Sequence, residues 1–224
     1  KYFGIFFLII SFFSFFNIIY SYYFNLLNNV NNYILSFGIT LLVGLFFLIF
    51  KKYRFEKINL FERILVVLIG YLILPAVISI PYYLNVDNIS IIDCYFEAIS
   101  GFTSTGFTIF NDLNKLDQTL ILWRSSSQWI GGLYFLFSIL LLIDIFDENL
   151  KRSLTNYISL NSLEIFKQVF KIIVIYLTMT IIIFLMLKLV NIRSYDAYNY
   201  SLTIISSGGF LPNNNFDTTF TTDI

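Results

Sequence analysis

The 224-residue chain has no histidine, one cysteine and only 12% charged residues. Without histidine, neither a Ser-His-Asp nor a Cys-His catalytic site can form, and imidazole metal sites are excluded too. Cys94 has no second cysteine for an internal disulfide and fits no zinc-ligand spacing, so we interpret it as a small buried helix residue. Basic and acidic residues balance at 14 each, which gives no net charge for binding nucleic acid. We therefore expect neither an enzyme nor a nucleic-acid-binding protein, and no bound cofactor.

Apolar residues dominate what is present: they make up 58% of the chain, and the mean hydropathy is +0.77. A soluble domain carries about 25% charged residues, so this composition predicts an all-α integral membrane protein. Five stretches are long enough, or nearly so, to cross a hydrocarbon core that needs about 20 residues. The first could instead be a signal peptide, but its apolar region is too long and no small-residue cleavage site follows. The five predicted spans are residues 2–24, 33–50, 64–84, 125–143 and 172–190.

The basic residues predict the orientation of these spans. Residues 51–63 hold five Lys and Arg between the second and third spans, and residues 151–171 hold four between the fourth and fifth. Cytoplasmic loops of membrane proteins are enriched in Lys and Arg. We therefore expect these two loops and the N-terminus to be cytoplasmic. The opposite side is then rich in Asp and Glu, which would raise the local concentration of cations.

One sequence pattern occurs twice, 103 positions apart. Asp93 begins a short helix-compatible stretch that leads to Thr-Ser-Thr-Gly-Phe at 103–107, and Asp196 begins one that leads to Ser-Ser-Gly-Gly-Phe at 206–210. Each copy follows a predicted span. A repeat of this size indicates a duplicated supersecondary unit. The unit is interpreted as a span, a short helix and a turn rich in glycine and hydroxyl groups.

The short helices are predicted at residues 93–102 and 196–205. Ten residues of helix reach only about 15 Å, half a bilayer, so each must enter the membrane and return. Asp93 and Asp196 stand where N-caps would be. The C-terminal ends then point at the turns, where their partial negative charge favours a cation. Glycine allows unusual backbone angles, and backbone carbonyls can replace the hydration shell of an ion, so the pattern predicts two loops of a cation pore.

Three segments resemble the Trk/Ktr potassium-uptake superfamily. Residues 96–106 are similar to its first pore loop, and residues 195–210 to its second. Residues 123–132, Trp-Arg-Ser-Ser-Ser-Gln-Trp-Ile-Gly-Gly, resemble the start of the helix between them and are the most specific of the three. The resemblance covers residues 61–224. The two preceding spans match the extra N-terminal pair of the Trk-type members.

The resemblance implies a membrane subunit of four span–pore loop–span repeats around one path, of which this chain holds two, the second truncated after its filter. The chain would then be an N-terminal fragment. It implies divisions at 1–60 (two N-terminal helices), 61–146 (first repeat), 147–166 (cytoplasmic linker) and 167–224 (second repeat). It also implies a homodimer gated by a cytosolic nucleotide-binding regulatory subunit. The potassium filter would be formed by Thr103, Ser104, Thr105, Gly106, Ser206, Ser207, Gly208 and Gly209.

The helix after the first loop carries further expectations. Trp123, Arg124, Gln128 and Trp129 are expected to brace the pore loop from behind, although Arg124 fits an interfacial anchor equally well. Gly131 and Gly132 would permit close helix packing. Two departures from the family concern other positions: residues 133–135 are bulky where small residues are usual, and residues 149–164 lack the expected acidic and glycine-containing pattern.

The sequence as a whole predicts potassium uptake across a bacterial inner membrane, with potassium as substrate and lipid as surroundings. Two alternatives stay open: a sodium-preferring or non-selective transporter of the same fold, and a membrane scaffold that does not transport. The remaining loops of the full reading frame would separate them. Whether the whole protein is a channel or an ion-coupled symporter is not decided by these residues.

Overall fold

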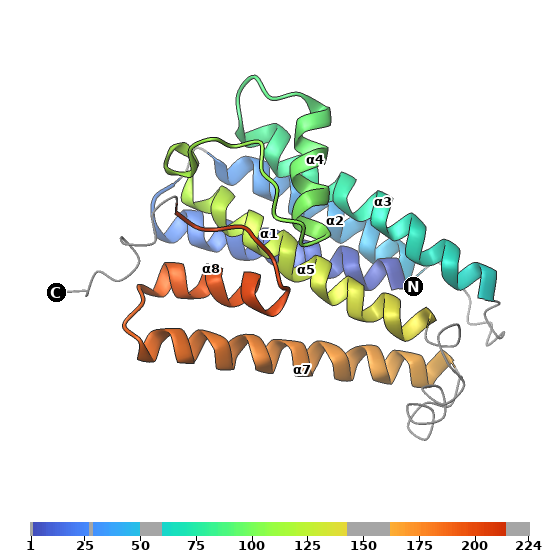
Figure 1. Cartoon of the computed structure of the whole chain (residues 1–224). Coiled ribbons are helices and arrows are strands. Elements are labelled where there is room, and N and C mark those ends of the chain that lie inside the picture. Colours follow the sequence, from blue (N-terminus) through green and yellow to red (C-terminus); the bar gives the residue numbers. More distant parts are fainter. Residues whose placement is uncertain (1, 27–28, 50–59, 143–161, 214–224) are drawn as a thin grey trace.

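The computed structural model describes residues 2–26, 29–49, 60–142 and 162–213, and these ranges contain helices without strands (Figure 1). The clusters of basic residues at 51–57 and 151–152, and most of the predicted linker, lie outside the described residues. The helices are α1 (Tyr2–Tyr23), α2 (Val30–Ile49), α3 (Leu60–Asn85), α4 (Ile91–Phe102), the 3-10 turn η2 (Leu113–Lys115), α5 (Gln118–Leu142), α7 (Ser162–Leu189) and α8 (Ser194–Ile205).

Five of these helices are long and apolar enough to cross a membrane: α1, α2, α3, α5 and α7. They fall on the five predicted stretches, which confirms the all-α membrane class. The start of the fourth span was predicted wrongly, because α5 begins at Gln118 and not at 125. The prediction began after Arg124 in order to keep the span uncharged. That guanidinium is buried against a carboxylate, so the helix can continue through it.

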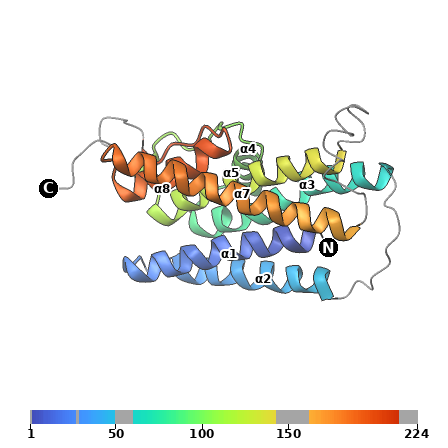
Figure 2. The same cartoon turned by 90° about the horizontal axis from the view of Figure 1, so that it is seen from below.

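The long helices run alternately in opposite directions (Figure 1). The ends of α2 and α5 and the starts of α3 and α7 lie together at one end of the bundle, α8 lies in the other half, and α4 stands near the middle. Seen from below, α1 and α2 form a pair along one side of the remaining helices (Figure 2). Neither short helix therefore lies at the end where α2 and α5 finish.

Helix α5 lies at the centre and packs against α1, α3, α4, α7 and α8. Every residue from Thr119 to Gly131 is buried. Yet α5 has the lowest mean hydropathy of the five spans, 1.3 compared with 2.1–2.6. Its serine hydroxyl groups form hydrogen bonds within the helix: Ser126 donates to the Leu122 carbonyl at 2.7 Å, and Ser127 donates to the Arg124 carbonyl at 2.6 Å. A helix that faces protein all round can carry polar groups that lipid would not accept.

Aromatic rings fill the space between α5 and the N-terminal helix. The Phe6 ring meets that of Tyr134 edge-on at 4.9 Å between centroids, and Phe13 lies 5.2 Å from Trp129. Edge-on and tilted contacts of this kind suit the ring quadrupoles. The two N-terminal helices thus belong to the same hydrophobic core as the first repeat. On the outward faces of α2 and α7, apolar side chains are exposed, as hydrocarbon surroundings allow.

Gly131 and Gly132 allow the ends of α4 and α8 to pack closely against α5, as predicted. A Cβ on Gly131 would overlap the carbonyl group of Phe102, the last residue of α4. A Cβ on Gly132 would lie 2.9 Å from the Cβ of Ser206, just after α8. Both half-crossing helices therefore end directly against α5, and the missing side chains make this possible.

Gly131→Ala should destabilise the full-length protein, because the new methyl group must push α4 and α5 apart. Overpacking of this kind costs about 1–3 kcal/mol. We expect the midpoint of thermal unfolding in detergent, followed by size-exclusion chromatography, to fall by several degrees. Gly38→Ala in α2 is the matched control, since nothing lies within 4 Å of its added Cβ. Equal midpoints for the two variants would contradict the close approach.

Candidate pore loops

The two half-crossing helices correspond residue by residue. Both α4 and α8 have 12 residues, and they end at Phe102 and Ile205 as predicted. Their C-cap residues share one backbone conformation, with φ −86° and ψ 2° at Thr103 and φ −88° and ψ 0° at Ser206. The repeat seen in the sequence is therefore a repeat of backbone structure.

The turns that follow the two helices are also alike. Ser104 and Ser207 have positive φ angles of 56° and 54°, which are uncommon for residues other than glycine. The amide of Thr105 donates to the Ser100 carbonyl at 3.0 Å, and the amide of Gly208 donates to that of Thr203 at 2.8 Å. Two serines in the same uncommon conformation at matched positions indicate that the turn geometry itself is required.

The predicted N-caps are wrong by three residues. Ser90 caps α4 by accepting from the Asp93 amide at 3.1 Å, and its hydroxyl donates to the Asp93 carboxylate at 2.7 Å. In α8 the cap position is Arg193, which makes no side-chain cap hydrogen bond, and Asp196 lies in the first turn. Both carboxylates still lie at the N-terminal end, where the partial positive charge of a helix favours them.

The predicted filter residues lie together at the C-terminal ends of α4 and α8. The two loops touch at their glycines: a Cβ on Gly106, whose φ is +81°, would lie 2.8 Å from the Cα of Gly209. Two hydroxyl groups are turned back to their own helices, since Thr103 donates to the Ile99 carbonyl at 2.7 Å and Ser206 to that of Thr203 at 2.9 Å. The sequence did not reveal this use of the hydroxyl hydrogens.

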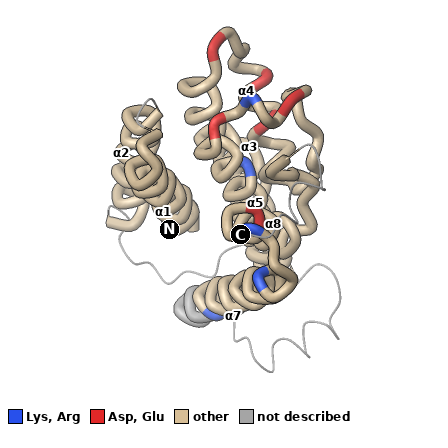
Figure 3. The backbone as a smooth tube through the Cα atoms, turned by 90° about the vertical axis from the view of Figure 1, so that its left-hand side faces the viewer, with Lys and Arg blue, Asp and Glu red and all other residues tan. Residues whose placement is uncertain are grey.

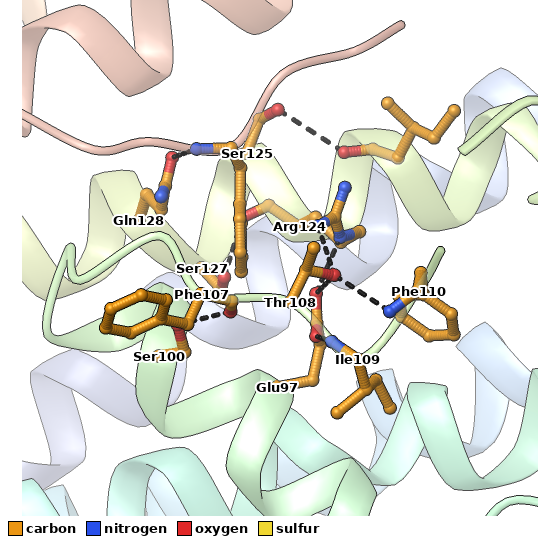
Figure 4. Close-up of polar contacts among 12 residues, drawn as sticks. Glu97, Ser100, Phe107, Thr108, Ile109, Phe110, Arg124, Ser125, Ser127 and Gln128 are labelled. Carbon is orange, nitrogen blue, oxygen red and sulfur yellow. Dashed lines mark hydrogen bonds and ion pairs between the residues drawn. The ribbon is translucent and has the colours of Figure 1, made fainter. Parts of the chain in front are cut away.

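A buried ion pair lies behind the first loop (Figure 4). Glu97 of α4 accepts from Nε of Arg124 at 2.8 Å, and the two side chains are 0% and 1% exposed. The second Glu97 oxygen accepts from the Ile109 amide at 3.0 Å. Arg124 therefore braces the loop, and the alternative of an interfacial anchor is wrong.

Sequence reasoning missed the role of Glu97, which was counted with the acidic outer surface. A signal was available, because a carboxylate within a membrane-embedded helix and an arginine in the neighbouring span each need an opposite charge. Pairing them would have placed both residues behind the loop.

Gln128 braces the second loop. With its amide oxygen facing the loop, the orientation that satisfies both partners, it accepts from the amides of Gly209 at 3.0 Å and Phe210 at 3.1 Å. The ring N–H groups of the two tryptophans, which were expected to brace the pore loop, bond to other elements. Trp123 donates to the Ile78 carbonyl of α3 at 2.9 Å, and Trp129 donates to Thr180 of α7 at 3.0 Å. They fasten α5 to the span that precedes each loop.

The second repeat has a buried carboxylate of its own. Asp196, 0% exposed, accepts from Nε of Arg193 at 3.1 Å and from the side-chain amide of Asn213 at 3.2 Å. In each repeat, a carboxylate of the short helix thus holds the chain that leaves the turn. The two carboxylates do not occupy matching positions, because the residue of the second repeat that corresponds to Glu97 is Tyr200.

Acidic residues surround this end of the bundle (Figure 3). Asp87, Asp93, Asp112 and Asp117 lie on the segments around α4. Within the described ranges, no three His, Cys, Asp or Glu side chains gather as a metal site. A cation at the turns would therefore meet backbone and hydroxyl oxygens there, with the carboxylates acting from a distance.

Known proteins share this arrangement. The crystal structure of the potassium transporter TrkH from Vibrio parahaemolyticus superposes with a TM-score of 0.68, covering 96% of this chain and 45% of that one at 22% identity. An uncharacterized cation transporter of Methanocaldococcus jannaschii, MJ1485, is 31% identical over 183 residues, which are 75% of this chain and 37% of that protein. The potassium uptake protein TrkH of Escherichia coli is 27% identical over 156 residues, 66% of this chain and 32% of that protein.

The chain thus spans about a third of the length of these two curated relatives. The sequence model of one family, described as TrkH, cation transport protein, matches residues 65–222, which include both short helices and their turns. Family members are transporters and not enzymes, as the missing histidines predicted. Because the match extends over more than half of its residues, this multi-pass membrane protein belongs to the TrkH family of cation transport proteins.

Proposed function

We propose that the chain supplies two of the loops of a potassium-uptake pathway. The observation that carries this is the matched pair of half-crossing helices whose turns meet at Gly106 and Gly209. Two helix C-terminal ends converge on one place, and their partial negative charges favour a cation there. A relative named as a potassium uptake protein matches 66% of the chain, and the family model matches residues 65–222, which include both turns.

The proposed filter comprises the backbone and hydroxyl oxygens of both turns. Backbone carbonyls would replace the hydration shell of a potassium ion, which is the transported substrate. The residues assigned to it are Thr103, Ser104, Thr105, Gly106, Ser206, Ser207, Gly208 and Gly209.

The whole protein would act in the cell (inner) membrane with a cytoplasmic N-terminus, as a homodimer with a cytosolic nucleotide-binding regulatory subunit. In this arrangement residues 1–60, 61–146, 147–166 and 167–224 keep the divisions predicted above. The acidic residues around α4 would then face outward and concentrate cations at the mouth.

Two observations weigh against a scaffold that does not transport. Positive φ angles recur at Ser104 and Ser207, and each short helix carries a buried carboxylate, Glu97 in α4 and Asp196 in α8. Features of this kind are costly and cluster at functional sites. A sodium-preferring or non-selective pathway differs only in the ion, which transport measurements decide.

Gly106→Ser in the full-length protein should relax selectivity for potassium over sodium. The new side chain meets both a φ of +81° and the Gly209 Cα at 2.8 Å, so the turn must change shape. We expect the selectivity ratio, from rubidium uptake in competition with sodium, to fall about tenfold, which corresponds to roughly 1.4 kcal/mol. Gly38→Ser is the control, as its added Cβ has open space. An unchanged ratio for Gly106→Ser would remove this residue from the filter.

The orientation is tested by cysteine labelling in a Cys94→Ser background. Single cysteines at Lys52 and Lys151 should be protected from an impermeant thiol reagent in intact cells and react after lysis. Single cysteines at Asn28 and Asn114 should react from outside, since Asn114 lies in the segment that follows the first short helix and position 28 lies between the first two predicted spans. Labelling of position 151 in intact cells would reverse the proposed orientation.

A further inference from the structure

Arg124 contacts both pore loops from its place on α5. Its Nε donates to Glu97 at 2.8 Å, and another guanidinium nitrogen donates to the Thr108 hydroxyl at 2.9 Å. The guanidinium carbon also lies 4.1 Å from the centroid of the Phe210 ring, a cation–π distance. Thr108 belongs to the first loop and Phe210 to the second.

These contacts lie very near the glycines that meet. Thr108 is two residues beyond Gly106, and Phe210 directly follows Gly209. The Phe210 ring is 2% exposed and lies against α4, since a Cβ on Gly101 would come within 2.9 Å of it. A small displacement of Arg124 would therefore be transmitted to both glycines.

Hydrogen bonds to three partners hold the Thr108 hydroxyl group in place. Its hydroxyl donates to Glu97 at 3.0 Å and accepts from Arg124 at 2.9 Å and from the Phe110 amide at 3.1 Å. A hydroxyl group has one hydrogen and two lone pairs, so its capacity is fully used. The ion pair and the outgoing limb of the first loop are thus one connected network (Figure 4).

The burial of the network suggests a role other than stability. Apolar residues of similar volume often stabilise a protein as well as a buried ion pair does, while removal of one partner is strongly unfavourable. A charged pair fixes direction and distance more tightly than apolar contacts do. The second repeat has Tyr200 at the position of Glu97, and its loop meets the Glu97–Arg124 pair through the Phe210 ring.

We propose that Arg124, held by Glu97, is a positioning residue for ion selectivity that couples the two pore loops. It fixes Thr108 and Phe210 together, and so sets the separation of Gly106 and Gly209. This inference rests on the proposed function, because selectivity has meaning only if the full-length protein transports a cation.

The test uses the full-length transporter in vesicles, with rubidium uptake measured against increasing sodium. Thr108→Val keeps the shape of the side chain but removes the hydroxyl group that bonds to both Glu97 and Arg124. Arg124→Lys keeps the positive charge but loses the planar guanidinium group. Phe210→Leu removes the aromatic ring that contacts Arg124. Each should lower the ratio of potassium to sodium selectivity roughly three- to tenfold. Lys115→Gln is the control for a change outside the network, since its side chain is 83% exposed, and it should leave the ratio unchanged.

Coupling between the loops is tested by the double variant. If Arg124 transmits its position to Phe210, Arg124→Lys combined with Phe210→Leu should lower the ratio by less than the product of the single effects. Variant protein in the membrane is quantified so that uptake is expressed per molecule.

The outcomes separate the two proposals. A wild-type protein without selective uptake would overturn the proposed function itself. A selective wild type, with variants that keep its ratio while their rates fall in step with protein amount, would make the network merely structural and overturn this inference. Thr108→Val is close in shape and leaves both charges in place, so it gives a result even if Arg124→Lys fails to fold.

Discussion

A chain that turns back inside a membrane must have its backbone polar groups covered by protein, and the structure depends on how α5 does this. Helix α5 is buried on all sides from Thr119 to Gly131. It faces the first turn with Arg124 and the second with Gln128, and its glycine pair lets both short helices end directly on it. Its polar residues would be unfavourable in lipid, yet at the centre they are the partners that the two loops need.

Charge placement follows from the same constraint. Glu97 and Arg124 are fully buried, and each is acceptable only because the other is 2.8 Å away. Their hydrogen bonds extend into the limb that leaves the first turn, so one buried pair determines how that limb lies. In the second repeat Asp196 holds the outgoing chain through Asn213, with Arg193 on its more exposed side. Similar geometry is therefore maintained by different side chains.

The conformations of the two turns are more alike than their sequences. Thr103 and Ser206 have nearly the same φ and ψ, and Ser104 and Ser207 nearly the same positive φ, although Thr105 in one repeat corresponds to Gly208 in the other. Around them the supports differ. The added Cβ of Gly208 would meet the Gln128 amide, whereas Thr105 bonds to Thr103 through their hydroxyl groups at 2.6 Å. In these two non-identical repeats, different side chains thus support a similar backbone.

The sequence by itself determined the five spans, the ends of the short helices at Phe102 and Ile205, and the pairing of the two turns. These depend on local hydrophobicity, length and spacing, which are properties of neighbouring residues. Only the tertiary structure decided that α5 continues through Arg124, that Glu97 is buried, and that the ring N–H groups of Trp123 and Trp129 bond to α3 and α7. Whether a charge is tolerated in a membrane depends on a partner distant in sequence, here 27 residues away, and that partner is known only once the helices have packed.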